Sequence, residues 1–246
     1  MRLEAKTAIV TGGGSGFGAG IARRFAAEGA QVMVVDLNGE AAAAVAQQIG
    51  GIAQVADVST AESVRAMTEA AIAAWGRVDI VVNNAGITHK PQPLETVTEA
   101  EFDRVFAVNA KSVYLTAREV VPHMKDAGAG AILNVASTAG VSPRPNLNWY
   151  NASKGWMITA TKAMAVELAP FGIRVNAVNP VAGETPLLKS FMGEDTPEIR
   201  AKFLSTIPIG RFSTPEDIAG AALYLCSDEA SMVTGVAMEV DGGRCI

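Results

Sequence analysis

Tyr150 and Lys154 stand four residues apart in the segment Tyr150-Asn151-Ala152-Ser153-Lys154, and Ser137 lies thirteen residues before Tyr150. On a helix, two residues with this spacing lie on one face, so the phenol and the ammonium would share the same space. A neighbouring positive charge favours the phenolate and lowers a tyrosine pKa from its ordinary value of about 10. A tyrosine tuned in this way can accept a proton from an alcohol or return one to a forming alkoxide. The alternative is a core tyrosine beside a surface lysine, so the rest of the chain has to decide.

A glycine-rich segment near the start of the chain offers a phosphate-binding loop. It reads Thr11-Gly12-Gly13-Gly14-Ser15-Gly16-Phe17-Gly18 and joins an apolar run to a helical pattern. Glycines let the backbone approach a pyrophosphate closely, and the N-terminus of the following helix favours its negative charge. A glycine-rich turn that only packs helix against strand remains the alternative.

Asp36 stands at the end of the second apolar run, twenty residues after Gly16. At this place a carboxylate can accept hydrogen bonds from an adenosine ribose, and it would repel a 2′-phosphate. Neither position 37 nor the glycine loop carries a lysine or an arginine that could bind that phosphate. The pattern therefore favours NAD over NADP, although Asp36 could also cap the following helix.

Polar residues also follow the next two apolar runs, at Asp57-Val58 and at Asn83-Asn84-Ala85-Gly86. Ligands of open α/β sheets bind at the carboxyl ends of the strands. We expect Asp57 to meet an adenine amino group and Asn83 to order the loop backbone near the adenosine. Pairing with turn amides is the alternative for both residues.

The elements that must position these residues alternate regularly along the chain. Short apolar runs predict strands at 7–10, 31–35, 52–56, 80–82, 131–135, 174–178 and 236–240. Alanine-rich patterns predict helices at 18–28, 39–49, 60–75, 99–126, 150–169, 187–205 and 215–227. Ser59 with Glu62 and Thr98 with Glu101 have the spacing of capping boxes, and Thr214 precedes a proline at a helix start. No linker or repeat interrupts the pattern, which predicts one doubly wound α/β domain over residues 1–246.

Composition excludes several classes of protein. The 246 residues are 49% hydrophobic and carry a net charge of −5 without a basic block, which argues against nucleic-acid binding. Two cysteines and two histidines, without metal-ligand spacing, predict neither a disulfide framework nor a metal site. Charges at the N-terminus and the lack of a long apolar run predict no signal peptide and no membrane span, so we expect a cytoplasmic protein.

Taken together, the motifs resemble those of the short-chain dehydrogenase/reductase family in its single-domain form of about 250 residues. The resemblance covers the whole chain, and the elements that carry it are Thr11-Gly12-x-x-x-Gly16-x-Gly18, Asp57, Asn83-Asn84-Ala85-Gly86, Asn109, Ser137, Tyr150-x-x-x-Lys154 and Asn179-Pro180. It implies a Rossmann-type, doubly wound parallel sheet of about seven strands, flanked by helices on both faces.

The resemblance also implies a role for each matching residue. Tyr150 would be the general acid/base, Ser137 would orient the substrate oxygen, and Lys154 would bind the nicotinamide ribose and lower the Tyr150 pKa. Asn109 would hold a water that links Lys154 to solvent. The residues expected to contact NAD are Gly12, Ser15, Gly16, Phe17, Gly18, Asp36, Asp57, Val58, Asn84, Ala85, Gly86, Tyr150, Lys154, Pro180 and Thr185.

One position departs from the family pattern. Family members usually have glycine after the proline, whereas Val181 follows Pro180 here. A β-branched residue avoids positive φ, so the loop could run differently beside Thr185, the expected ligand of the nicotinamide carboxamide.

The substrate pocket is expected from segments 87–93, 138–148 and 181–205, with a lid over about 183–210. Leu187, Leu188, Phe191 and Met192 could provide its apolar contacts or pack on the protein itself. His89 and Arg144 are the polar candidates, and Arg144 could receive a carboxylate or a phosphate-bearing group or lie paired on the surface.

Three functions compete. The first is an NAD-dependent dehydrogenase that acts on a secondary alcohol, or on the ketone in reverse. The second is a 3-oxoacyl-thioester (acyl-carrier-protein) reductase, which Asp36 and the scarcity of positive charge disfavour. The third is a non-catalytic NAD-binding regulator, which Tyr150 and Lys154 disfavour.

The family resemblance also implies a homotetramer joined through helices 99–126 and 150–169 and through the C-terminal strand. Met157, Ile158, Thr161 and Met164 would suit such a contact, and ordinary core packing would explain the same residues.

Overall fold

A computed structural model describes all residues from Met1 to Ile246. Seven parallel strands form one sheet in the order β3-β2-β1-β4-β5-β6-β7. Their bounds are β1 Thr7–Thr11, β2 Gln31–Asp36, β3 Ile52–Val55, β4 Ile80–Asn83, β5 Gly130–Val135, β6 Ile173–Pro180 and β7 Ala237–Val240. The order reverses direction at β1, as in a doubly wound sheet, so the predicted fold class is confirmed.

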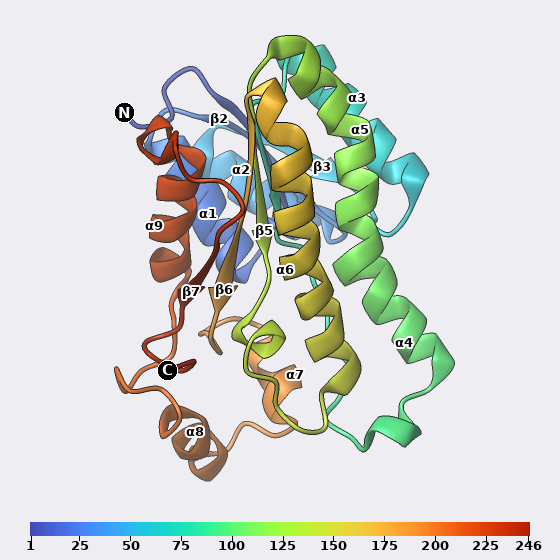
Figure 1. Ribbon diagram of the computed structural model, residues 1–246, viewed down its shortest axis with the longest axis vertical. Coiled ribbons are helices and arrows are strands. Elements are labelled where there is room, and N and C mark those ends of the chain that lie inside the picture. Colours follow the sequence, from blue (N-terminus) through green and yellow to red (C-terminus); the bar gives the residue numbers. More distant parts are fainter.

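Helices cover both faces of the sheet (Figure 1). One layer packs its buried side chains against one face and contains α1 (Gly16–Ala27), α2 (Gly39–Ile49) and α9 (Pro215–Cys226). The other layer contains α3 (Ala61–Trp75), α5 (Ser112–Ala127) and α6 (Asn148–Leu168). The central strands are mostly apolar because both of their faces are covered.

Two predicted helices are interrupted. The segment predicted as one helix over 99–126 forms α4 (Glu99–Phe106), a π-helical turn (Ala107–Lys111) and then α5. The segment predicted over 187–205 forms two short helices, α7 (Leu188–Met192) and α8 (Pro197–Leu204), separated at Gly193 with φ 77°. Both short helices lie beyond the carboxyl ends of the strands, at the bottom of Figure 1.

Of the three helix starts predicted from capping signals, two begin at the expected N-cap residue. Thr98 with Glu101 and Thr214 with Asp217 form capping boxes. The box predicted at Ser59 is wrong, because the Ser59 backbone and hydroxyl both donate to the Asp57 carboxylate, and Thr60 caps α3 instead.

A chain of buried polar side chains joins the middle of the sheet to α6. Asn83 on β4 donates to the side-chain oxygen of Asn134 on β5 (2.9 Å), the residue opposite it in the strand register. Asn134 in turn donates to the Thr161 hydroxyl (2.8 Å), and that hydroxyl donates to the Met157 carbonyl. The side-chain amides of Asn83 and Asn134 thus both have partners, as an apolar sheet interior requires.

Thr161 and Met157 are therefore buried inside the chain. Core packing, rather than a subunit contact, accounts for the burial of these two side chains.

Candidate active site

A cavity of about 790 Å³ runs along the carboxyl ends of the strands. Segments that follow six of the seven strands contribute to its wall, together with α6, α7 and α8. The expected site residues that line it are Gly12, Ser15, Gly16, Phe17, Asp36, Asp57, Val58, Asn84, Ala85, Gly86, Ser137, Arg144, Tyr150, Lys154, Pro180, Thr185, Leu187 and Phe191. Gly18, Asn109 and His89 do not line it.

The glycine loop holds its shape through close contacts that leave no room for side chains. A Cβ on Gly18 would stand 2.1 Å from the Gly12 carbonyl oxygen, and Gly12 itself has φ 61°. Ser15 is the N-cap of α1, and its side chain makes no capping hydrogen bond. The first N–H groups of a helix have no partner within the helix, so this end of α1 presents free donors to the cavity. Such a cradle fits a pyrophosphate.

Asp36 ties the glycine loop to the second strand. One carboxylate oxygen accepts from the Gly14 N–H (3.0 Å) and the other from the Asn38 N–H (3.0 Å). Asn38, not Asp36, caps α2, so the capping alternative for Asp36 is wrong. Leu37 beside it is 70% exposed and also lines the cavity, so this corner offers a carboxylate and an apolar surface.

The contacts of Asp57, Asn83 and Asn84 differ in part from those expected from the sequence. The Asp57 carboxylate accepts two bonds from Ser59, which lower its pKa, while the residue still lines the cavity. Asn84 rather than Asn83 orders the glycine loop, since its amide donates to the carbonyls of Thr11 (2.9 Å) and Gly12 (3.0 Å). The expectation for Asn83 was wrong because its side chain points into the sheet.

Tyr150 and Lys154 lie on one face of α6, as their spacing predicted. The Lys154 ammonium is 5.9 Å from the centre of the Tyr150 ring and donates to the Val135 carbonyl (2.8 Å). Burial lowers the pKa of Lys154 to about 8. Burial also raises the pKa of Tyr150 to about 12, against the opposing effect of its hydrogen bond with Ser137. The pKa of Tyr150 is thus shifted in the direction opposite to the expected depression, because desolvation outweighs the hydrogen bond with Ser137.

Asn109 lies behind this pair and is fully buried. Its side-chain amide donates to the Ile87 carbonyl (2.9 Å) and to the Ser153 hydroxyl (3.0 Å), and its oxygen accepts from the Ile87 N–H (2.9 Å). The π-helical turn that carries Asn109 widens the helix, so Ser112 donates to Ala107 five residues before it. The side chain of Asn109 is thus fixed by Ile87 and Ser153 and does not reach the cavity.

The substrate end of the cavity is apolar and aromatic. Phe191 on α7 packs edge-on against Tyr150, with ring centres 5.0 Å apart, and Leu187 lines the same wall. Leu188 and Met192 instead pack on the protein, in a small core with Val181. Phe203 on α8 also lines the cavity. The sequence did not predict this position, because the direction of α8 depends on the break in the helix at Gly193.

Of the two polar residues expected to contact the substrate, only Arg144 reaches the cavity. Arg144 lines the cavity, with its guanidinium over the Phe203 ring. His89 is buried away from the cavity, and its Nδ1 lies 2.8 Å from the Lys90 carbonyl oxygen. The expectation that His89 meets the substrate is therefore wrong.

The departure at Val181 leaves the loop unstrained. Val181 has no positive φ, and the next glycine, Gly183, stands against Phe17, where a Cβ would lie 2.3 Å from the ring. Thr185 follows and approaches the glycine loop, so that a Cβ on Gly16 would lie 3.1 Å from the Thr185 Cβ. The path of this loop therefore keeps Thr185 on the cavity wall.

No group of three or more His, Cys, Asp and Glu side chains is placed to hold a metal ion. None of the helices combines the length and the apolar character that crossing a membrane requires.

Known proteins resemble this chain over its full length. A family model described as enoyl-(acyl carrier protein) reductase matches residues 12–244. The 4-formylbenzenesulfonate dehydrogenase TsaC1/TsaC2 of Comamonas testosteroni is 53% identical, and 100% of both chains is covered. The 3-oxoacyl-[acyl-carrier-protein] reductase FabG of Thermotoga maritima is 40% identical, again over 100% of both chains.

Among solved structures, a 3-ketoacyl-(acyl-carrier-protein) reductase from Brucella melitensis, complexed with NADH, is 54% identical with a TM-score of 0.95. The match covers 99% of this chain and 100% of that chain. These relatives are dehydrogenases and reductases that share the fold and the whole length of this protein, and the chain belongs to the short-chain dehydrogenase/reductase family of oxidoreductases.

Proposed function

We propose that this protein transfers hydride between NAD(H) and the carbinol or carbonyl carbon of a small alcohol or ketone. The observation that carries the proposal is the continuous cavity. A glycine cradle, an uncapped helix N-terminus and the Asp36 carboxylate line one end, and Tyr150, Ser137 and an apolar wall line the other. The NADH complex of the Brucella melitensis relative supports the same choice of cofactor.

The residues of the first end suit a dinucleotide. The free N–H groups of α1 and the Ser15 side chain would bind the pyrophosphate, and Asp36 would accept from the adenosine ribose in place of its present bond to Gly14. Asp57, Val58 and Leu37 would bound the adenosine, and Lys154 with Thr185 would hold the nicotinamide half. When bound, the cofactor accepts or supplies the hydride.

The residues of the second end suit proton transfer. Tyr150 would accept the alcohol proton and return it in the reverse direction, while Ser137 would hold the same oxygen. Lys154, with its pKa lowered to about 8, would pass the proton onward. Asn109 would complete the relay by holding a water on its main chain, since its side chain is fixed by Ile87 and Ser153.

The test is initial-rate absorbance at 340 nm with NAD and NADP against alcohols, ketones, aromatic aldehydes and a β-ketoacyl thioester. Aromatic aldehydes belong in the panel because the Comamonas testosteroni relative is named for one. Turnover of a small alcohol with NAD, at a kcat/KM well above that with NADP, is expected. Binding of NADH with no turnover of any substrate would favour a binding-only regulator and contradict the proposal.

A 3-oxoacyl-thioester reductase is the second candidate, because two similar proteins carry that activity in their names. Reduction of an acetoacetyl thioester that exceeds every alcohol and ketone in kcat/KM would establish it. The acidic chain, with a net charge of −5, is a poor partner for an acidic carrier protein.

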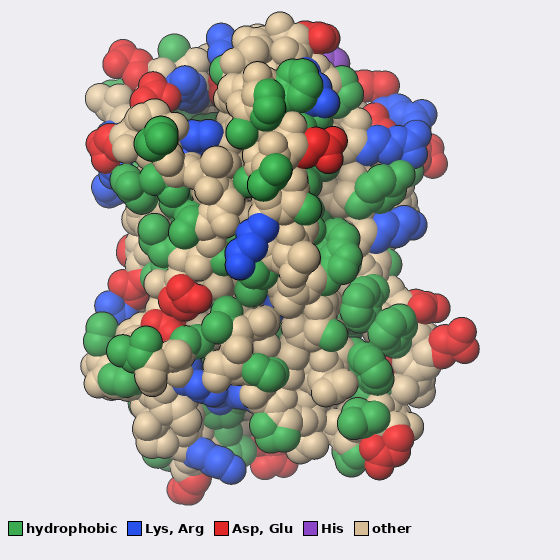
Figure 2. Space-filling view, in the orientation of Figure 1, with side chains coloured by type: hydrophobic (Ala, Val, Ile, Leu, Met, Phe, Trp, Pro, Cys, Tyr) green, Lys and Arg blue, Asp and Glu red, His purple; other side chains and the backbone are tan.

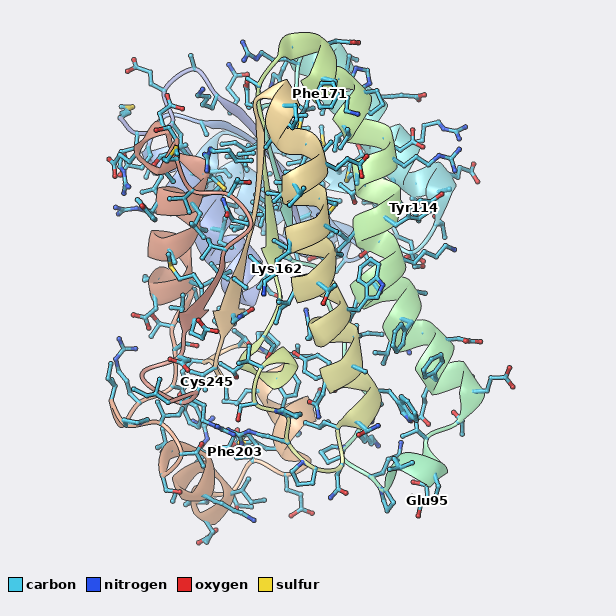
Figure 3. The ribbon with its side chains drawn as sticks, viewed as in Figure 1. Glu95, Tyr114, Lys162, Phe171, Phe203 and Cys245 are labelled. Atoms are coloured by element: carbon cyan, nitrogen blue, oxygen red, sulfur yellow. The ribbon has the colours of Figure 1, made fainter.

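Assembly as a homotetramer is part of the same proposal. Tyr114 on α5 and Trp156 and Val166 on α6 expose 54%, 40% and 80% of their surfaces, and Tyr114 stands out from α5 in Figure 3. These side chains, not the buried Met157 and Thr161, are the ones available to a subunit contact. Light scattering on the purified protein would give the mass, and that of a single chain would contradict the tetramer.

A further inference from the structure

Arg144 lines the substrate end of the cavity, and Arg244 lies beside this wall on Ser142; neither arginine has a carboxylate partner. Arg144 comes from the loop before α6, and Arg244 comes from the turn that follows β7. Neither forms an ion pair, whereas Arg200 and Arg211 of the neighbouring lid segment are both paired with aspartates. Like charges held close together favour the binding of an anion between them.

The contacts of Arg144 fix it as part of the cavity wall. Its guanidinium lies 4.3 Å from the centre of the Phe203 ring, and Nη2 donates to the Thr206 hydroxyl (3.1 Å). Its carbonyl accepts from the side chain of Asn151, the residue after Tyr150 (2.7 Å). Stacking on a ring and anchoring at the main chain leave the remaining N–H groups of the fork for a ligand.

Arg244 contacts the loop that carries Arg144, at Ser142. Its Nη1 donates to the hydroxyl of Ser142 (3.1 Å), a residue of the cavity wall, and its Nε is buried without a partner. The nearby Asp241 carboxylate is occupied by the N–H groups of Gly243 and Cys245. The Asp241 carboxylate therefore leaves the charge of Arg244 without an ion-pair partner beside the cavity wall.

The two arginines influence each other. Burial lowers the pKa of Arg144, and the positive charge of Arg244 lowers it further. Figure 2 shows Lys and Arg side chains at the lower left, where Figure 1 places α8 and the turn after β7, and Figure 3 places Phe203 and Cys245 in that region. The turn after β7 contacts the lid directly, since Ile209 donates to the Gly242 carbonyl (3.1 Å).

We propose that Arg144 and Arg244 form an anion subsite that binds a carboxylate or sulfonate substituent on an aromatic alcohol or carbonyl substrate. The substrate ring would lie between Phe191 and Phe203, so that its reacting carbon reaches Tyr150 while its charge reaches the arginines. The inference deepens the proposed function, on which it rests for the reacting end of the substrate. Arginine is suited to both groups because its planar fork binds two oxygens at once.

The kinetic test compares three alcohols with NAD: benzyl alcohol, 4-(hydroxymethyl)benzoate and 4-(hydroxymethyl)benzenesulfonate. The wild type should prefer at least one anion over benzyl alcohol by about 10-fold or more in kcat/KM, and added salt should reduce the preference. Arg144→Met and Arg244→Met should each lower the anion-to-neutral ratio by about 10- to 100-fold, as expected for the loss of a charge-assisted contact. Arg144→Lys should retain part of the preference.

Arg200→Met is the matched control. It removes the same charge at the same end of the molecule, from the lid, but from a guanidinium that already pairs with Asp195. Its anion-to-neutral ratio should equal that of the wild type. An equal loss in Arg200→Met would show that net charge alone is responsible and would overturn the subsite, as would an unchanged ratio in both Arg144→Met and Arg244→Met.

A binding measurement separates this proposal from the function itself. Calorimetric titration of benzoate and benzenesulfonate into the wild type should show binding of one or both, weakened about 10-fold or more in Arg144→Met. Such binding without turnover of any alcohol would retain the subsite and reject the proposed function. Normal turnover of benzyl alcohol, with neither anion bound, would reject the subsite and retain the function.

Discussion

The buried ammonium of Lys154 predicts an unusual dependence of stability on pH. Burial holds its pKa at about 8, against an ordinary value of 10.5. Between these two values the unfolded chain binds more protons than the folded protein, so the free energy of unfolding rises with pH. The contribution of Lys154 is least favourable below pH 8, where both states are charged and the folded one holds that charge out of water.

The magnitude follows from the shift. From pH 7 to pH 10, relief of the buried charge should raise the free energy of unfolding by about 2 to 3 kcal/mol. Tyr150 acts in the opposite sense, because burial raises its pKa from 10.0 to about 12, and stability is lost as pH rises through that range. At pH 10 this loss is still below about 0.5 kcal/mol, so the effect of Lys154 dominates.

Urea unfolding of the wild type and of Lys154→Met at pH 7, 8, 9 and 10 measures the effect. The variant keeps an unbranched side chain one atom shorter and has no titrating group at this position, and ionisable residues away from it cancel in the difference. The wild type should gain about 2 kcal/mol or more on the variant as pH rises from 7 to 10. Parallel curves for the two proteins would refute the reasoning, because they would mean that the ammonium is not desolvated.

Three further predictions concern the site. Tyr150→Phe should lower kcat by about 100-fold or more while the affinity for NADH, from fluorescence titration, changes little; near-normal turnover would remove Tyr150 as the acid/base. Asp36→Ala should reduce the ratio of kcat/KM with NAD to that with NADP, and an unchanged ratio would show that Asp36 does not select the cofactor. Gly18→Ala should abolish NADH binding and lower the melting temperature, since its Cβ would stand 2.1 Å from the Gly12 carbonyl oxygen; unaltered binding would contradict the tight loop.

The sheet could be predicted because each strand is a short apolar run bounded by polar turns. All seven strands lie within a few residues of the predicted ranges, and both capping boxes with a threonine at the N-cap formed. These signals are local, so neighbouring residues alone carry them.

The breaks in helices depended on contacts that are remote in sequence. Asn109 opens its π-helical turn while it bonds Ile87 and Ser153, which lie on other elements. Gly193 was the local signal for the break between α7 and α8, and its positive φ could have been anticipated.

Some features of the site could likewise be predicted from local sequence, and others depended on contacts between residues remote in sequence. Tyr150, Lys154 and Asp36 were identified from spacing, because a helix face or a strand end fixes where they point. The direction of the Tyr150 pKa was not, since it depends on how completely the fold buries the ring. The meeting of Arg144 and Arg244, one hundred residues apart, could not be read from the sequence at all.

The polar chain from Asn83 through Asn134 to Thr161 bears on how the sheet assembles without error. Apolar strands of a parallel sheet resemble one another, so a neighbour displaced by one residue could still bury its side chains. Here such a displacement would separate the two amides and leave buried donors and acceptors unpaired, at about 1 to 3 kcal/mol for each group. The hydrogen bond between the two asparagines therefore stabilises the observed register of β4 and β5 relative to a displaced one.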